Sequence, residues 1–503
     1  MIAILILPMF LGIIYGLYAS YQYAWYILIV VNLFLMQYAY VYLSVVLKQK
    51  QFIEKEIKQH QVYVSNPESY PTNVHHVIVI PVYNESISII QKTLQVICEH
   101  EFALDYTIMF ALEQKDPNLD QYLKHLPLFV GDLLEEHAGI SVFKSPIFHN
   151  VLTTIHPEES VKGKHMNLNY ALRQLYKMPR FTDLKILVTV TDADAHIPSL
   201  YMQYITRTYS NHDEYVLFAP STTFAQNPST VPSLVRANDA GWAFGHMTCL
   251  VHPNKIMPLS SYSLPLNLIH AMNYWDISEY GFGEDSATMF RAVSWTQKNQ
   301  LPMDLQAVLI PFNYLSVNAN GYFGTIMERY KQSLRHNLAY LMLEKSIHTA
   351  LEIKTKRMMG LVGCYFECVI MTLLMGLVWV ILAMCVYEWT TGMSNVHTQL
   401  LGVEWSEFLL KFGCIWMVAL FPVLALGYDM NHYFVGKYKL YGLAKYEQHS
   451  ILAHFDIGFF PISCFFFLLC PAIHAATQIA WMQTKKLLFG IEYEFMVDSS
   501  KKQ

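Results

Sequence analysis

The sequence predicts an α/β domain with a mostly parallel sheet, inserted between transmembrane α-helices. Two observations predict this architecture. Long apolar blocks lie toward both ends of the chain, whereas residues 48–357 have the composition of a globular protein. Within that middle part, short β-branched runs alternate with segments of helical periodicity, which is the pattern of βαβ units around a mostly parallel sheet.

The apolar blocks account for a composition that is 53% hydrophobic and only 15% charged. Because a helix needs about 20 apolar residues to span a bilayer, we expect two spans within residues 1–47 and about three within residues 358–503. Glu367 falls inside the third run, where its carboxylate either lines a polar conduit or lies at the cytosolic interface. The apolar runs are Ile2–Tyr18, Tyr23–Leu47, Met358–Tyr387, Phe412–Tyr428 and, less cleanly, Ile457–Met482.

Basic residues predict which side of the membrane holds the central domain. Four lysines follow the second run and three basic residues precede the third, whereas residues 388–404 contain no Lys or Arg. Since short cytoplasmic loops carry the excess of Lys and Arg, we expect the central domain in the cytosol.

The net charge and the cysteine spacing each argue against particular kinds of site or partner. The net charge is −5 and the chain has no dense basic stripe, which argues against a nucleic-acid partner. The eight cysteines show no paired metal-ligand spacing, so neither a zinc site nor a disulfide framework is indicated.

Five short apolar runs are expected to form strands, with helices between them. After the second strand, a polar helix and a loop are expected up to about Glu159. The expected strands are His76–Pro81, Tyr106–Leu112, Ile186–Val190, Tyr215–Ala219 and Gln306–Ile310. The expected helices are Ser86–His100, Met166–Tyr176 and segments near Pro198–Tyr209 and Val231–Gly245.

Two carboxylates, Asp192 and Asp194, follow the strand Ile186–Val190 and are separated by one small residue. In open α/β sheets, ligands bind outside the carboxyl ends of the strands. A hard divalent cation prefers oxygen ligands and often shares them with substrate phosphates. The pattern is therefore consistent with a metal site, and equally with a loop whose Asp residues cap the next helix.

Other polar groups follow the neighbouring strands. The Tyr83–Glu85 segment lies at a strand end, where aromatic and polar groups can hold a base, and Glu113 could accept a hydrogen bond from a base N–H. Lys162 and Lys164 flank a glycine and could reach diphosphate oxygens. A solvated basic turn before a helix is the alternative interpretation of this lysine pair.

Two later segments also contain candidate functional residues. Glu284 and Asp285 precede a helical run, Ser286–Ser294, and either cap that helix or supply a general base. The segment Arg329–His336 lies on an amphipathic helix before the third apolar run, which indicates a helix resting on the membrane surface. Arg335 there could pair with a phosphate bidentately, or the helix could simply have a basic surface.

Taken in this order, the segments resemble family 2 glycosyltransferases of GT-A fold. They are most similar to the membrane-integrated branch that contains cellulose, chitin and hyaluronan synthases. The resemblance covers roughly residues 76–345. The matching segments are Ile80–Glu85, Lys162–Lys164 with Asn169–Leu172, Thr191–Asp194, Gly283–Asp285, and Gln332-x-x-Arg335-His336.

On the donor side, the resemblance implies that the Tyr83–Glu85 segment and Glu113 hold the nucleotide base, with Glu113 where the family usually has Asp. Lys164 and Asp192 would contact the nucleotide diphosphate. Asp194, together with Asp192, would bind the Mg²⁺ or Mn²⁺ that bridges the diphosphate.

On the acceptor side, the resemblance implies that Asp285 is the base that deprotonates the acceptor hydroxyl. Gln332 and Arg335 would line the acceptor and diphosphate side, with Glu284 and His336 beside them. A single base without a second carboxylate nucleophile indicates inversion at the anomeric carbon.

The resemblance implies two transmembrane helices in residues 1–47, a cytosolic GT-A domain over 48–325, interface helices over 326–357 and further transmembrane helices with a short tail over 358–503. We therefore expect an integral membrane protein of the plasma membrane or Golgi. It would transfer a sugar from a UDP-sugar donor to a growing polysaccharide and export the product through its own helices.

Two departures from the family pattern keep other acceptors open. His336 stands where the family has Trp, and Ser260–Ser263 stands where many synthases carry a Gly-rich acceptor-pocket sequence. A transferase acting on a lipid acceptor, similar to ceramide glucosyltransferases, is the second hypothesis. A membrane transporter or receptor that senses nucleotide sugars is the third.

Overall fold

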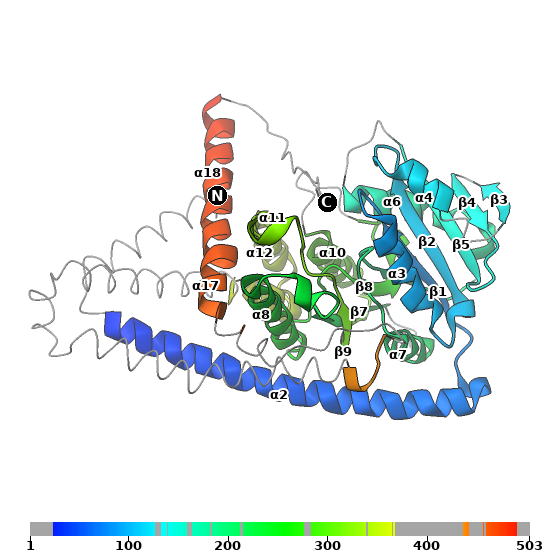
Figure 1. The fold of residues 1–503 in the computed structure, drawn as a ribbon, viewed down its shortest axis with the longest axis horizontal. Helices are drawn as coiled ribbons and strands as arrows, with labels where there is room; N and C mark the ends of the chain where they lie inside the picture. Colours follow the sequence, from blue (N-terminus) through cyan, green and yellow to red (C-terminus); the bar gives the residue numbers. More distant parts are fainter. Residues whose placement is uncertain are drawn as a thin grey trace, which may run out of the picture.

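The computed structural model contains a single nine-stranded sheet within the residues that it describes (Figure 1). Those residues are 24–125, 132–137, 139–157, 163–181, 184–211, 215–275, 283–338, 341–364, 366–367, 436–441, 456 and 459–489. The strand order is β3-β4-β5-β2-β1-β6-β8-β7-β9. The strands are β1 His75–Pro81, β2 Tyr106–Glu113, β3 Leu133–His137, β4 Ile140–Phe143, β5 Asn150–His156, β6 Ile186–Val190, β7 Tyr215–Thr223, β8 Tyr262–Pro265 and β9 Met303–Asn313.

The sheet is mostly parallel, as the sequence predicts. β1 pairs in parallel with β2 and β6, β2 with β5, and β7 with β9. β8 lies antiparallel between β6 and β7, so these two neighbours share one direction. The carboxyl ends of six strands therefore meet at one edge of the sheet. All eight residues of β2 are buried, which is why this strand is almost continuously apolar.

All five predicted strands are present, but the expected loop after the second strand is wrong. That stretch contains a short helix, α4 (Leu119–His125), and the three strands β3, β4 and β5. Of these, β3 and β4 form an antiparallel pair at the edge of the sheet. β5 includes Asn150, Thr153, Thr154 and His156, all buried, so polar side chains interrupt the apolar run that marks a central strand. The four-residue strand β8 is also absent from the sequence prediction.

Helices cover both faces of the sheet and form two apolar layers. Along β1, Val77 and Val79 belong to one buried cluster, whereas Ile78 and Ile80 belong to the other. This alternation is the two-residue period of a strand whose faces are both covered. The covering helices are α3 Ile87–Cys98, α6 Lys164–Tyr176, α7 Ser199–Ser210, α8 Ser233–Leu250, α9 Leu266–Ala271 and α10 Glu284–Lys298.

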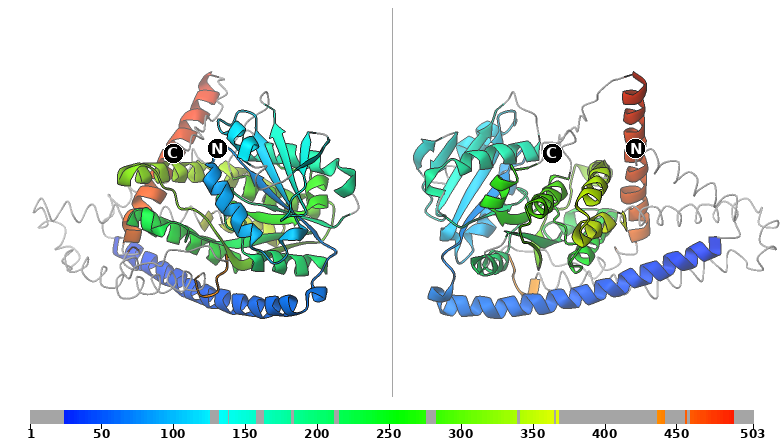
Figure 2. Two further views of the ribbon diagram at one scale, coloured as in Figure 1. Left: turned by 45° about the vertical axis from the view of Figure 1, so that its right-hand side comes forward. Right: turned by 180° about the vertical axis from the view of Figure 1, so that it is seen from behind.

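The helix α2 (Ala24–Ser65) runs the length of the molecule beneath the sheet, as Figures 1 and 2 show. It crosses the expected domain boundary between residues 47 and 48 without a break. Val45, Val46 and Gln49 are fully buried, and α2 contacts α7, α8 and β9. One face of the end of the second apolar run is therefore buried against the central domain, whereas Tyr40 and Leu47 are 76% and 45% exposed.

One described segment, Ile462–Ile479, is a helix long and apolar enough to cross a membrane. It belongs to a continuous helical stretch formed by α17 (Phe460–Cys464), a wider turn at Phe465–Leu469 and α18 (Cys470–Phe489). The runs Ile2–Tyr18 and Phe412–Tyr428, like most of Met358–Tyr387, lie outside the described residues.

Candidate active site

The candidate site lies where the strand order reverses, at the carboxyl edge of the sheet. From β1, the chain continues to β2 on one side, and β6 later pairs on the other side. Loops on either side of such a reversal leave a crevice in which ligands bind. The Tyr83–Glu85 segment follows β1, and Asp192 and Asp194 follow β6, so both predicted groups border this crevice.

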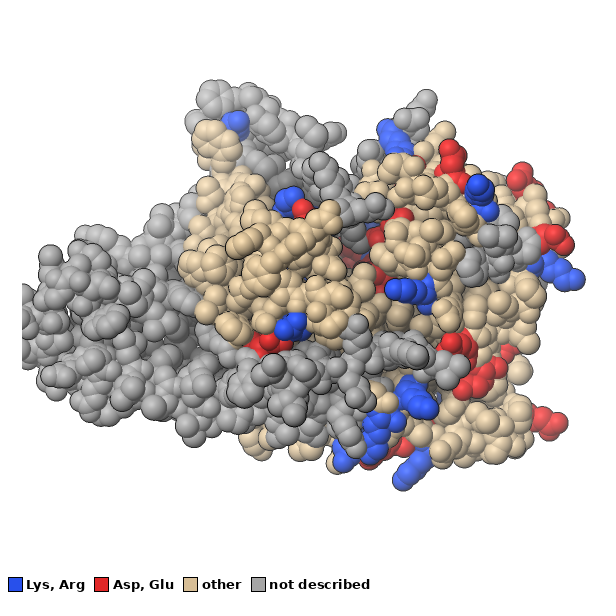
Figure 3. Space-filling model, viewed as in Figure 1, with Lys and Arg blue, Asp and Glu red and all other residues tan. Residues whose placement is uncertain are grey.

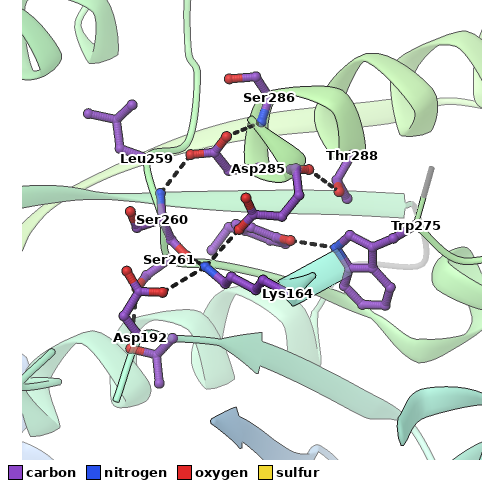
Figure 4. A network of polar contacts seen from close by, with 12 residues as sticks. Lys164, Asp192, Leu259, Ser260, Ser261, Trp275, Asp285, Ser286 and Thr288 are labelled. Carbon is purple, nitrogen blue, oxygen red and sulfur yellow. Dashed lines mark hydrogen bonds and ion pairs between the residues drawn. The ribbon is translucent and has the colours of Figure 1, made fainter. Parts of the chain in front are cut away.

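Lys164 joins three segments that are far apart in the sequence (Figure 4). Its Nζ lies 2.7 Å from Asp192 Oδ1 and 2.7 Å from Glu284 Oε1, and it donates to the carbonyl of Ser260 at 3.0 Å. Burial acts to lower the pKa of Lys164, but the attraction of Asp192 and Glu284 outweighs it and raises this pKa well above its ordinary value. Lys164 is therefore a fixed positive charge between two carboxylates.

Gly163 places this lysine at the first position of α6. Its φ is +138°, a conformation that side chains disfavour, and a Cβ added there would lie 2.7 Å from the ring of His165. A residue with a side chain at position 163 would displace either His165 or the start of α6. The sequence signal Lys-Gly-Lys is thus explained in part by backbone geometry. Lys162 lies outside the described residues.

Asp285 lies in the first turn of α10 and is held by two backbone donors. Its Oδ2 accepts from Ser260 N at 2.8 Å, and its Oδ1 accepts from Ser286 N at 2.6 Å. Burial and the charge of Glu284 raise the pKa of Asp285 to about 6, against the opposing effect of the two N–H groups and Lys164. The result is an oriented carboxylate whose pKa lies close to neutral pH, where a general base is most effective.

Ser260 connects Asp285 with Lys164, and its role is not visible in the sequence. Its N–H donates to Asp285, its carbonyl accepts from Lys164, and its φ is +53°. The left-handed conformation costs a non-glycine residue about 1–2 kcal/mol, and strain of this kind clusters at functional sites. Tyr314, after β9, donates to Ser261 Oγ at 2.7 Å and supports the same turn.

The predicted base-binding residues lie at the carboxyl ends of the adjacent strands β1 and β2. Tyr83 and Glu85 are half-buried, whereas Glu113 is 5% exposed. The loop after β1 is held by groups that sequence reasoning missed. Asp116 accepts from Asn84 N at 2.7 Å, and the hydroxyl of Tyr122 accepts from the backbone N–H of Glu85 at 2.8 Å. 

Three predicted acceptor-side residues, Gln332, Arg335 and His336, lie on α11 (Gly321–Leu338), next to α8 (Figure 1). Arg329 of α11 and Asp239 of α8 form a buried ion pair that joins the two helices. A guanidinium nitrogen of Arg329 lies 2.6 Å from Asp239 Oδ1. Arg329 also donates to the side chain of Gln332, which is thereby positioned. Burial lowers the pKa of Arg335, while Glu328 and Asp192 oppose this, so Arg335 lies within electrostatic reach of Asp192.

His336 is exposed and lies edge-on to the ring of Trp242, with 5.3 Å between the ring centroids. The family pattern has a Trp at position 336 itself. In this protein, a half-buried Trp from α8 instead lies beside that position.

Asp194 lies on the same loop as Asp192, separated from it by the buried Ala193. Among the described residues, no group of three or more His, Cys, Asp or Glu side chains is arranged to hold a metal ion. Mg²⁺ typically keeps several waters and uses one or two carboxylates together with substrate phosphates. The pair of half-buried carboxylates fits such a substrate-completed site.

The chain matches no family model and no curated protein. Among solved structures, it is similar to the mannosyltransferase PcManGT from Pyrobaculum calidifontis in complex with GDP-Man and Mn²⁺, at 12% identity, with 80% of this chain and 99% of that chain covered and a TM-score of 0.39. It is also similar to S. aureus TarS 1–349, at 10% identity, with coverage of 83% and 93% and a TM-score of 0.33. The UDP-GlcNAc complex of TarS 1–349 gives 9% identity, 81% and 92% coverage and a TM-score of 0.32. At these TM-scores the likeness carries no argument about function.

Proposed function

We propose that this chain is a metal-dependent inverting glycosyltransferase that uses a nucleotide-sugar donor. The supporting observation is the linked pair of Asp285 and Lys164, which bind the N–H and the carbonyl of the same residue, Ser260. A carboxylate with a near-neutral pKa is thereby held close to a fixed cation. Transfer of a sugar from a diphosphate requires a base and a charge-stabilised leaving group in this relation.

In the proposed reaction, Asp285 takes the proton of an acceptor hydroxyl while that oxygen attacks the anomeric carbon. The bond from this carbon to the diphosphate oxygen breaks, and the negative charge on the leaving diphosphate is stabilised by Lys164 and Arg335. Glu284 already pairs with Lys164, so Asp285 remains the base of a single displacement, which inverts the anomeric centre.

Asp192 and Asp194 would hold a Mg²⁺ or Mn²⁺ ion against the diphosphate. When bound, the ion would act as a Lewis acid that neutralises charge on the phosphate oxygens. The Tyr83–Glu85 segment and Glu113 would surround the nucleotide base at the neighbouring strand ends.

Metal removal tests this assignment. Transfer should vanish in a chelator and return with Mn²⁺ or Mg²⁺, and Asp194→Asn should abolish turnover, because a neutral amide is a poor ligand for a hard cation. Turnover and the unfolding temperature in detergent should be measured together, and the unfolding temperature should stay near that of the wild type. An active Asp194→Asn enzyme would contradict the metal assignment.

The pKa of Asp285 predicts an acid limb in the pH profile. Because that pKa is raised to about 6, the carboxylate is ionised above this pH and protonated below it. Turnover should therefore be retained at pH 7–8 and fall as the pH drops through about 6. The check is kcat/KM measured from pH 5 to pH 8, which reports ionisation of the free enzyme. A profile that stays flat down to pH 5 would place the base elsewhere.

For the acceptor, we propose a growing polysaccharide exported through the chain's own helices, as the resemblance implies. An acceptor in the lipid phase is the second candidate, favoured by the start of α11. Tyr322, Phe323 and Met327 are 54%, 80% and 54% exposed there. In Figure 3, charged side chains gather on the right, over the sheet and the adjacent end of α2, whereas the described surface around α8 and α11 carries few.

A donor panel tests the proposed function. The purified full chain is incubated with radiolabelled UDP- and GDP-sugars, and the label is followed into polymer, into lipid or into neither. Label in polymer supports the synthase, and label in lipid supports the lipid-acceptor enzyme. Donor binding without transfer would support a nucleotide-sugar sensor. Recovery of the protein from carbonate-washed membranes tests the proposed integral membrane location.

A further inference from the structure

The start of the third apolar run packs against the catalytic domain. Residues 356–364 are helical, and Met358 and Leu361 are fully buried in the core cluster that also contains Leu250. Gly360, Cys364 and Glu367 follow one another at spacings of four and three, so they share one face of a helix.

Each of these three residues meets a partner at or just beyond the end of α8. A Cβ added to Gly360 would lie 2.4 Å from the carbonyl oxygen of Asn254, so the two backbones approach closely. Glu367 forms an ion pair with Lys255. Its partner belongs to the central domain.

Between these contacts, the sulfur of Cys364 lies 3.1 Å from the sulfur of Cys249, the penultimate residue of α8. Neither cysteine is part of a disulfide. A disulfide has a sulfur–sulfur length of about 2.05 Å, so the two atoms need to close by only about 1 Å. The Gly360 contact and the Lys255 ion pair hold the two segments together on either side.

We propose that Cys249 and Cys364 form an oxidation site, at which a disulfide joins the helix of the third apolar run to α8. The chemical class of oxidant is a small disulfide such as oxidised glutathione. In the reducing cytosol the resting form is the dithiol, and the bridge forms when the glutathione pool becomes oxidised.

The exposure of the two thiols gives the order of the steps. Cys249 is half-buried and reachable, whereas Cys364 is fully buried. The thiolate of Cys249 attacks one sulfur of oxidised glutathione and releases one glutathione. Cys364 then attacks the Cys249 sulfur of this mixed disulfide and releases the second glutathione. Two protein thiols are oxidised, one glutathione disulfide is reduced to two thiols, and the protons balance.

The bridge would connect the proposed membrane part to the helix that positions α11. α8 carries Asp239, which pairs with the buried Arg329 of α11. The bridge also closes a loop between positions 115 apart. Because a cross-link over a long loop restricts the unfolded chain, the oxidised protein should unfold at a higher temperature, by about 5 °C or more.

The test uses the full chain in detergent. The protein is treated with oxidised or with reduced glutathione, the remaining thiols are blocked with N-ethylmaleimide, and non-reduced peptides are identified by mass spectrometry. We expect a linked peptide pair containing Cys249 and Cys364 only after oxidation, together with the higher unfolding temperature.

Serine variants distinguish this pair from general thiol reactivity. Cys364→Ser should trap glutathione on Cys249 and abolish the stabilisation, whereas Cys98→Ser, on α3, should form the bridge normally. The proposal is overturned if the wild type accumulates glutathione on Cys249 without a bridge, if both thiols remain open to N-ethylmaleimide, or if Cys249 bridges to Cys368. None of these measurements depends on transferase activity, and the wild-type result stands even if a variant fails to fold.

Discussion

Asp285→Asn should lower sugar transfer by about 10²–10⁴-fold, which is the contribution of a positioned general base. The amide oxygen can still accept from Ser260 N, but the amide NH2 group then faces the N–H of Ser286. The unfolding temperature of the variant should therefore be measured beside that of the wild type. Donor affinity should change little, because the proposed donor contacts come from Asp192, Lys164 and the metal. The decisive measurement is donor affinity alongside turnover.

Two variants control this experiment. Asp304→Asn removes a carboxylate near the opposite end of β9, where the side chain accepts a hydrogen bond from Gln306, and should leave transfer unchanged. Glu284→Gln should reduce transfer less than Asp285→Asn, because Glu284 acts through its ion pair with Lys164. If Asp285→Asn lowers donor affinity and turnover together, Asp285 is a donor-binding or structural residue and the base lies elsewhere.

The parallel core was predictable from the sequence because its strands are buried on both faces. Ile186–Val190 is apolar at every position except Thr189 and has the predicted bounds. Searching for apolar runs missed β5, because Thr153 and Thr154 are buried there although they are polar. Whether a threonine is buried depends on the surrounding fold, which the local sequence does not reveal.

The functional side chains of the candidate site could be recognised in the sequence. The backbone segment that connects them could not. Asp192, Lys164 and Asp285 stand in recognisable motifs after strands or before helices. Ser260 has no such motif, and its left-handed conformation follows from contacts with residues 96 and 25 positions away. Hydrogen bonds between residues so far apart in the sequence are set by the fold, so local sequence patterns cannot predict them.

The membrane spans were predicted from apolar composition. Composition shows that a segment is hydrophobic, but not whether protein or lipid covers its side chains. Val45 and Val46 lie in the second run and Met358 and Leu361 in the third, and all four are fully buried in the protein. Burial against a protein core and burial in lipid favour the same side chains. The bounds of a membrane span therefore cannot be read from hydropathy where a helix also packs on a soluble-type domain.

Lys164→Met should lower transfer by at least about 10²-fold, the usual effect of removing one preorganised group that stabilises developing charge. The methionine keeps the length of the side chain but leaves Asp192 and Glu284 without their shared cation. Donor affinity should fall as well, because the diphosphate would then face carboxylates alone. Lys177→Met, at the exposed end of the same helix, is the matched control and should retain both properties.

The pH profile separates this electrostatic role from a purely structural one. Lys164 lowers the pKa of Asp285, while burial and Glu284 raise it. Removing the lysine should therefore raise the pKa of Asp285 further and move the acid limb of kcat/KM to higher pH. Residual activity of Lys164→Met, measured across pH 5–9, should recover in part as the pH increases. If the limb stays at its wild-type position while activity is lost, Lys164 does not act on Asp285, and the coupling between base and cation proposed for this site is wrong.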